Sequence, residues 1–268
     1  MLIQADQKRK QYLEKRTLPS FFRRASKPFL LLLLLAVFQN GCARPLTVPI
    51  GSELLTGPEH PLRTLIVYLP GNGDAANAFK RYGLLSLMGD RRISADVVGV
   101  DAHLGYYLNG SVIERLKQDV IDPAKKRGYD HIWLVGNSLG AYGSLLYVSR
   151  YPADISGVVL LGAYAGERKI VREIDHAGGL NAWEPGTIVE KDWDRQLWAW
   201  LKQYPGHATE YPPLYLGYGR WDRFTYCQDL LATVLPADRD VVVVGEHDWS
   251  TWKKAWGLLL EKTAAQMK

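Results

Sequence analysis

The feature that most constrains the fold is a Gly-x-Ser-x-Gly sequence at residues 136–140, which reads Gly-Asn-Ser-Leu-Gly. The apolar run His131–Val135 predicts a buried strand before it, and residues 139–151 carry apolar side chains at helical spacing after it. The serine therefore lies where a strand turns sharply into a helix. Glycines fit both flanks because a side chain there would collide with the strand or the helix. Such a turn would present the Ser138 hydroxyl at the carboxyl edge of a sheet, beside a helix dipole that favours a developing anion.

The rest of the chain alternates between strand and helix patterns. Predicted strands cover residues 62–69, 95–101, 131–135, 156–162, 213–218 and 240–245. Predicted helices cover residues 75–88, 111–127, 139–151, about 190–203, 224–234 and the chain from about 249 onward. The runs Gly157–Leu161 and Val241–Val244 are continuously apolar, as expected of strands with helices on both faces. We expect the α/β class, with a doubly wound and mostly parallel sheet.

Positive charge is concentrated at the N-terminus. Residues 1–41 hold eight Lys or Arg against two acidic residues, so this segment carries +6 and the remainder carries −1 of the formal +5. The body of the chain therefore gives no electrostatic reason to expect nucleic-acid binding.

The N-terminal segment has the features of an export signal. Its basic part ends at Lys27, and the apolar run Phe29–Phe38 follows. As a helix this run rises about 15 Å, half of the ~30 Å bilayer core, so we predict a signal peptide over residues 1–41 rather than a membrane span.

The residues that end the signal resemble a lipobox. Gly41 and Cys42 match the bacterial lipoprotein pattern, in which the cysteine is lipidated and becomes the mature N-terminus, whereas Gln39 departs from the usual Leu. Ala43 after the cysteine favours the periplasmic face of the outer membrane by the same resemblance. The alternative is an ordinary secretory signal with an incidental cysteine. With Cys42 lipidated, Cys227 would have no disulfide partner.

The expected domain organisation follows from these segments. Residues 42–61 are proline-containing and aperiodic, which predicts a tether, and residues 62–268 are long enough for one domain with its own core. Nothing in the sequence indicates an oligomeric state.

A serine nucleophile needs a base, and the base needs an orienting acid. His247 lies in a loop beyond the last predicted strand, on the rim that would carry Ser138. Asp222 lies just beyond the strand at 213–218, and its alternative role is the N-cap of the next helix. Asp192, Asp194 and Asp248 are weaker candidates for the acid.

These pieces together resemble the α/β-hydrolase superfamily over residues 62–266. The Gly-x-Ser-x-Gly turn, the Pro-Gly-Asn-Gly loop at 70–73, Asp222 and His247 match the family's chain order. The run His247-Asp248-Trp249, with Trp252, is similar to the end of esterase-D-like and feruloyl-esterase-like members. Asn137 departs from the His that precedes the serine in many esterases.

The resemblance implies a role for each matching residue. Ser138, His247 and Asp222 would form a catalytic triad, and the backbone N–H of Leu139 would donate to the oxyanion. A second donor would be the N–H of Asn72 or of Gly73.

Residues 163–212 interrupt the strand rhythm and contain Trp183, Trp193, Trp198 and Trp200. In α/β hydrolases an insertion at this place often forms a cap over the active site. The alternative is that these tryptophans only pack onto the core.

The expected function is hydrolysis of a carboxylic ester, either a small molecule or a lipid, by a protein held on a membrane through Cys42. Neither a metal nor an organic cofactor is expected, because the sequence has no His-Glu-x-x-His, no Cys-x-x-Cys and no acidic cluster. The alternatives are an acyltransferase or thioesterase with the same triad, and a non-catalytic lipid-anchored binding module.

Overall fold

The computed structural model describes residues 44–56, 63–207 and 209–267. These residues build a seven-stranded sheet in the order β1-β3-β2-β4-β5-β6-β7. The strands are β1 (Ser52–Leu54), β2 (Thr64–Leu69), β3 (Asp96–Val100), β4 (His131–Asn137), β5 (Gly157–Leu161), β6 (Leu214–Gly219) and β7 (Asp240–Val243). β1 pairs with β3 in the antiparallel sense, and every other pair is parallel. The predicted α/β class and mostly parallel sheet are confirmed.

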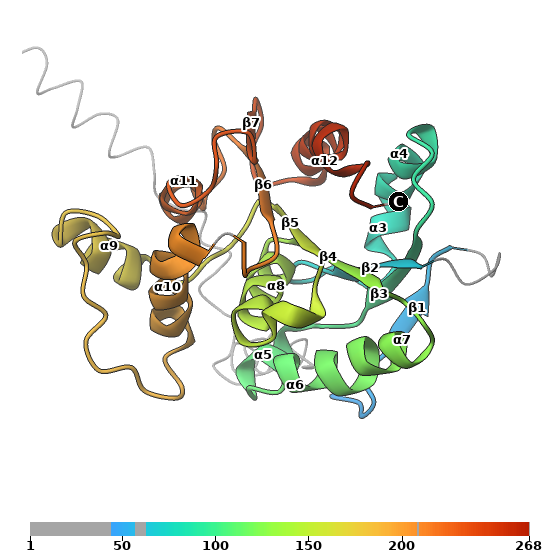
Figure 1. Cartoon of the computed structure of the whole chain (residues 1–268), viewed down its shortest axis with the longest axis horizontal. Coiled ribbons are helices and arrows are strands. Elements are labelled where there is room, and N and C mark those ends of the chain that lie inside the picture. Colours follow the sequence, from blue (N-terminus) through green and yellow to red (C-terminus); the bar gives the residue numbers. More distant parts are fainter. Residues whose placement is uncertain (1–43, 57–62, 208, 268) are drawn as a thin grey trace, which may run out of the picture. The chain divides into compact units, whose positions relative to one another are not determined.

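Helices cover both faces of the sheet. They are α3 (Ala78–Arg81), α4 (Leu84–Asp90), α5 (Leu104–Leu108), α6 (Val112–Leu116), α7 (Asp122–Lys126), α8 (Leu139–Arg150), α9 (Arg168–His176), α10 (Trp193–Gln203), α11 (Thr225–Ala232) and α12 (Trp249–Thr263). Figure 1 shows α3, α4 and α12 on one face, and α5, α6 and α8 on the other.

The two faces of β2 feed two separate cores. Ile66 and Tyr68 pack with the helices α3, α4 and α12, whereas Val67 and Leu69 pack with α6 and α8. Successive side chains of a strand point to opposite faces, so a strand covered on both sides is apolar throughout. All six residues of β2 are buried, as this arrangement requires.

Two predicted helices are interrupted. The helix predicted at 75–88 becomes α3 and α4 because Gly83 between them is left-handed, with φ 78°. The helix predicted at 111–127 contains a π-helical turn at Lys117–Ile121 before α7. Pro123 opens α7 and has no N–H to continue the regular hydrogen-bond ladder.

β7 is an edge strand, and its environment differs from the predicted one. Val242 is 43% exposed and Val244 is 61% exposed, although the run Val241–Val244 reads as a strand covered on both faces. Helix α12 packs against β7, which is the last strand of the sheet order. The continuous apolar run therefore predicted that these residues form a strand, but it did not predict how much of the strand is exposed.

The predicted tether at 42–61 contains an ordered part of the sheet. Ser52, Glu53 and Leu54 form β1 and pair with Val100, Gly99 and Val98 of β3. A three-residue edge strand with one apolar side chain is too short to show alternation, so no sequence pattern predicted a strand there. Cys42 lies outside the described residues.

The insertion at 163–212 contains two helices, α9 and α10, of which the sequence indicated only α10. Trp183, Trp198 and Trp200 are buried in the same core cluster as α8. The Nε1 atom of Trp198 donates to the Ala165 carbonyl at 2.8 Å. These three tryptophans pack as core side chains, whereas Trp193 lines a cavity.

Candidate active site

Ser138 lies in a strained turn between β4 and α8. Its backbone has φ 51° and ψ −115°, and it is one of two non-glycine residues with positive φ in the described chain. A Cβ atom on Gly136 would lie 2.3 Å from the Gly140 carbonyl oxygen, and one on Gly140 would lie 2.0 Å from the Leu69 carbonyl oxygen. Only glycine fits at either position, because these distances are far inside van der Waals contact.

The structure brings Ser138, His247 and Asp222 together. The Nε2 atom of His247 lies 3.0 Å from the Ser138 Oγ atom. The Nδ1 atom of the same ring lies 2.9 and 2.8 Å from the two carboxylate oxygens of Asp222. The three residues come from the carboxyl ends of β4, β6 and β7, which meet at one edge of the sheet.

The Asp222 side chain is fully buried, and that of His247 is 9% exposed. Asp222 also accepts a hydrogen bond from the backbone N–H of Phe224 at 2.8 Å, so it bonds both the imidazole and the loop before α11. One carboxylate thus fixes the loop and the ring, in a site from which water is largely excluded.

Two aromatic rings contact the imidazole of His247, and neither contact was predicted from the sequence. Phe224 meets the His247 ring edge to face at 4.8 Å and 89°, and Trp252 meets it at 4.9 Å and 86°. Trp252 belongs to α12, so the helix after His247 helps to orient the ring. The signal was present in the run His247-Asp248-Trp249 with Trp252, but sequence spacing alone does not separate ring contacts from ordinary core packing.

The remaining acidic candidates have other partners. Asp248 caps α12 by accepting from the Thr251 N–H, and Asp192 caps α10 by accepting from the Arg195 N–H. Asp194 accepts from the Tyr142 hydroxyl at 2.5 Å and from the Glu167 N–H at 2.8 Å. Asp222 is thus the acid that the structure places against His247.

The buried side chain of Asn137 connects the serine turn to the loop after β2. Its Oδ1 atom accepts from the Tyr68 hydroxyl at 2.7 Å and from the Gly71 N–H at 3.0 Å. Its Nδ2 atom donates to Asp74 Oδ2 at 3.2 Å, and Trp249 Nε1 donates to Asp74 Oδ1 at 3.3 Å. In the sequence, Asn137 is visible only as a departure from the usual His, because a pattern cannot show that a side-chain amide reaches a second loop.

The loop that carries Asn72 and Gly73 lies against the serine. A Cβ atom on Gly71 would lie 3.3 Å from the Ser138 Cβ atom. The Gly71 N–H is taken by Asn137, whereas Asn72 and Gly73 are exposed and Gly73 has φ 87°. The Leu139 N–H lies in the first turn of α8, where no earlier helical carbonyl can accept it.

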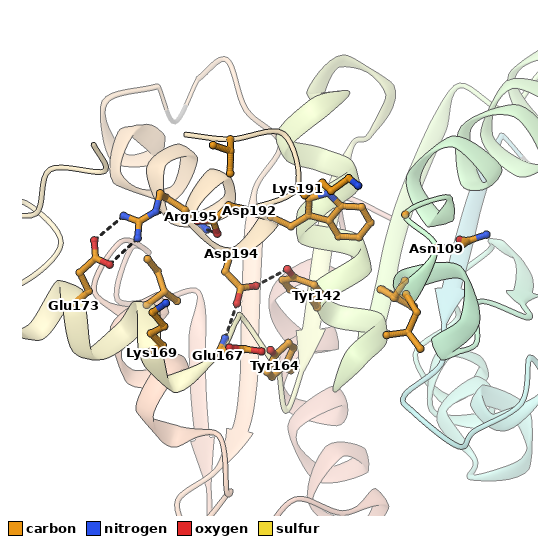
Figure 2. A pocket seen from close by; sticks show the side chains of 16 residues that line it. Asn109, Tyr142, Tyr164, Glu167, Lys169, Glu173, Lys191, Asp192, Asp194 and Arg195 are labelled. Carbon is orange, nitrogen blue, oxygen red and sulfur yellow. Dashed lines mark hydrogen bonds and ion pairs between the residues drawn. The ribbon is translucent and has the colours of Figure 1, made fainter. Parts of the chain in front are cut away.

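A cavity of about 820 Å³ lies between the insertion and the helices α5 and α8. Figure 2 shows Tyr142 and Tyr164 on its wall, with Asp194 facing Tyr142 and with Glu173 paired to Arg195 on the α9 side. None of Ser138, Asp222 and His247 lines the cavity. One lining residue contacts the serine turn, because the backbone N–H of Tyr164 donates to the Ser138 carbonyl at 3.3 Å. The Tyr164 ring also contacts the Phe224 ring, at 5.4 Å between centroids.

Polar contacts fix the cavity wall. The Arg195 guanidinium binds both carboxylate oxygens of Glu173, at 2.6 and 2.7 Å. Hydrogen bonds from Arg195 lower the pKa of Glu173 to about 2, so this pair stays charged at neutral pH. Burial raises the pKa of the Tyr142 hydroxyl, which therefore remains a donor to Asp194.

No group of three or more His, Cys, Asp or Glu that could hold a metal ion occurs among residues 44–56, 63–207 and 209–267. No helix in these ranges is both long and apolar enough to span a bilayer.

Known proteins resemble this chain in structure rather than in sequence. No family model matches the sequence, and no curated protein is similar to it in sequence. Among solved structures, the chain is similar to the S-formylglutathione hydrolase of Staphylococcus aureus, with 18% identity, a TM-score of 0.52, and coverage of 77% of this chain and 81% of that one.

Two further structures give the same result. A fluorophosphonate-binding serine hydrolase of Staphylococcus aureus is 15% identical, with a TM-score of 0.55 and coverage of 84% of this chain and 96% of that one. Est1E of Butyrivibrio proteoclasticus is 13% identical, with a TM-score of 0.57 and coverage of 81% and 92%. The chain has the α/β-hydrolase fold. Within this fold, the turn at Ser138 follows the central strand β4, and the loop after β2 lies against this turn.

Proposed function

We propose that the protein is a serine hydrolase that cleaves carboxylic esters. The observation that supports this most is the uninterrupted set of contacts from the Ser138 hydroxyl through His247 to the buried Asp222 carboxylate. The similarity to solved structures contributes the fold alone, because every identity is below 20%.

In the proposed reaction, the Ser138 oxygen attacks the ester carbonyl carbon while His247 Nε2 takes the hydroxyl proton. The backbone N–H groups of Leu139 and of Asn72 or Gly73 stabilise the oxyanion. The alkoxide leaves with the proton from His247, and an acyl-serine remains. Water, deprotonated by His247, then attacks the acyl carbon; the bond from this carbon to the Ser138 oxygen breaks, the proton on His247 returns to that oxygen, and the acid is released. Asp222 keeps the imidazole in the tautomer with Nδ1–H and stabilises the imidazolium.

We also propose that Cys42 carries a lipid that holds the protein on a bacterial membrane, with the domain facing the periplasm. The motif around Gly41 and Cys42 and the short apolar run before it support this proposal. An acyltransferase or a thioesterase would use the same residues, so the products formed with and without an added alcohol acceptor distinguish transfer from hydrolysis.

The test is covalent labelling of the full chain, purified from membranes, with a fluorophosphonate probe and detection by intact mass. We expect one adduct on the wild type, none on Ser138→Ala, and one on Ser149→Ala, a control serine in the helix α8 that follows Ser138. Folded wild type without an adduct would overturn the hydrolase proposal in favour of a non-catalytic binding module.

A further inference from the structure

The described chain begins against the edge of the sheet that carries the serine. The Arg44 Nη2 atom lies 2.5 and 2.7 Å from the carboxylate oxygens of Asp101, which directly follows β3. The Thr47 N–H donates to the Tyr106 hydroxyl at 2.9 Å, and that hydroxyl donates to the Thr47 carbonyl at 3.0 Å. Because β3 runs parallel to β2, these contacts fasten residues 44–47 at the carboxyl edge of the sheet.

Large apolar side chains are exposed at the same place. Leu46 is 43% exposed, Val48 75%, Leu104 39% and Leu108 79%. Leu104 and Leu108 lie four residues apart on α5 and therefore share one side of that helix. Leu46 packs against the same helix at Gly105, since its Cδ2 atom lies 3.1 Å from where a Cβ atom on Gly105 would be. Val48 directly follows Thr47, which is bonded to Tyr106 of α5. We call these four side chains the α5 apolar face.

The chain upstream of this face is short. Cys42 precedes Arg44 by two residues, and two fully extended residues span about 7 Å. A lipid on Cys42 would therefore enter the bilayer within a few ångströms of a segment that Asp101 and Tyr106 already fix to the domain. A long flexible linker would let the domain rotate freely relative to the membrane, whereas a connection of two residues restricts this rotation.

We propose that the α5 apolar face docks on the surface of the lipid bilayer, so that the carboxyl edge of the sheet and its serine face the membrane. This inference rests on the proposed lipidation of Cys42. The occupant is a bilayer rather than a protein partner, because the proposed anchor would hold lipid beside these side chains. Transfer of exposed aliphatic side chains from water into the bilayer lowers the free energy.

The docking face also borders the cavity. Leu108 lines the cavity, and so does Val189, which is 57% exposed and comes from the insertion. A bilayer against α5 would thus lie at the rim of the cavity. The substrate class that fits this geometry is an amphiphilic ester that partitions into the membrane.

The test measures the depth of single spin labels on the full, lipidated chain in vesicles of phosphatidylethanolamine and phosphatidylglycerol. The variants are Leu108→Cys on the α5 apolar face and, as the matched control, Leu258→Cys on α12, where the native side chain is 42% exposed. The native Cys227 is fully buried and should stay unlabelled, and the lipid would block Cys42.

We expect the label at position 108 to lose collisions with a water-soluble nickel chelate and to gain collisions with oxygen, while the label at 258 stays accessible to the chelate. Val48→Cys gives the same measurement if the variant at 108 does not fold.

Labels that are water-accessible at both positions would overturn the proposal, and labels in lipid at both would show unspecific insertion and overturn it as well. Dipolar broadening between labels at 108 would mean that a second copy of the chain covers the face. Protein without a diacylglyceryl mass on Cys42 would remove the anchor on which the proposal rests. Fluorophosphonate labelling of the same samples reports on Ser138 separately, so the loss of one proposal is distinguishable from the loss of the other.

Discussion

At the scale of single residues, the site depends on side chains that would never touch a substrate. Asn137 forms three hydrogen bonds, one with Tyr68 and two with Gly71 and Asp74 of the loop after β2. These bonds set the distance between the serine turn and the backbone amides of Asn72 and Gly73. An oxyanion donor displaced by a fraction of an ångström loses much of its effect on the transition state. Asn137 is therefore a positioning residue in the proposed reaction.

Replacing Asn137 separates these contacts. Asn137→Ala leaves the buried Tyr68 hydroxyl and the Gly71 N–H without an acceptor, and we expect a loss of about 1–3 kcal/mol in the free energy of unfolding. Asn137→Asp keeps the acceptor for both groups but sets a carboxylate against Asp74, so kcat should fall while KM changes little. Urea denaturation and ester kinetics measure the two effects. Unchanged kcat in both variants would contradict the positioning role, and Asn181→Ala, at an exposed position, is the control.

Cys227 is a fully buried thiol whose ionisation is suppressed by its surroundings. Burial raises the pKa of its thiol to about 12, so almost no thiolate exists at pH 8 in the folded protein. We expect a maleimide to leave Cys227 unmodified in native protein and to modify it fully in urea, as measured by intact mass. Rapid native modification would show that the segment after Phe224 opens locally.

At the scale of elements, the serine turn is set by two glycines that hold β4 and α8 against β2. Gly140→Ala would place a methyl group 2.0 Å from the Leu69 carbonyl, and neither backbone can move without breaking the sheet register. We expect a loss of at least about 1–3 kcal/mol in stability and loss of fluorophosphonate labelling. The matched control is Gly89→Ala in α4, which has open space around it and should gain about 0.5–1 kcal/mol.

The two helices of the insertion are linked by the ion pair between Glu173 and Arg195. The pKa of Glu173 is lowered in the folded state, so the pair contributes stability above the unfolded-state pKa near 4.5 and loses it as the pH falls toward about 2. We expect the protection of α9 amides, measured as the exchange rate relative to the intrinsic rate at each pH, to fall across this window in wild type. In Glu173→Gln, this protection should already be lower at pH 7, with no further fall on acidification. Equal exchange in both proteins would show that packing of Trp183 and Trp198 alone holds the insertion.

Several elements were predictable because their signal is local. The helix α8 and the strands β4 and β5 follow from apolar spacing, and the turn at Ser138 follows from the two glycines around it. Helix α9 was missed although Ile170, Val171 and Ile174 have helical spacing, because charged residues dilute the pattern over a short segment. The strand β1 was missed because it depends on a long-range pairing with β3, and a segment of three residues is too short to show a strand pattern of its own.

At the scale of the whole molecule, the order of the strands in the sheet determines features that local sequence patterns do not predict. The positions of His247 and Asp222 were predicted from their place after late strands, and the structure brings both to Ser138. The exposure of Val242 and Val244 depends on β7 being the last strand of the sheet, which no pattern within β7 records. The contacts of Asn137, Phe224 and Trp252 likewise depend on how separate segments meet, so they appear only in three dimensions.

The position of His247 between the last strand of the sheet and α12 has a consequence for biosynthesis. Its ring is held by Trp252, and Trp256 of the same helix is buried between Phe79 and the sheet, so the ring is oriented only after α12 has docked. A nascent chain that still lacks α12 therefore holds Ser138 without an oriented imidazole beside it. If the chain is exported as proposed and crosses the membrane before α12 folds, the proposed hydrolase would first become active outside the cytoplasm.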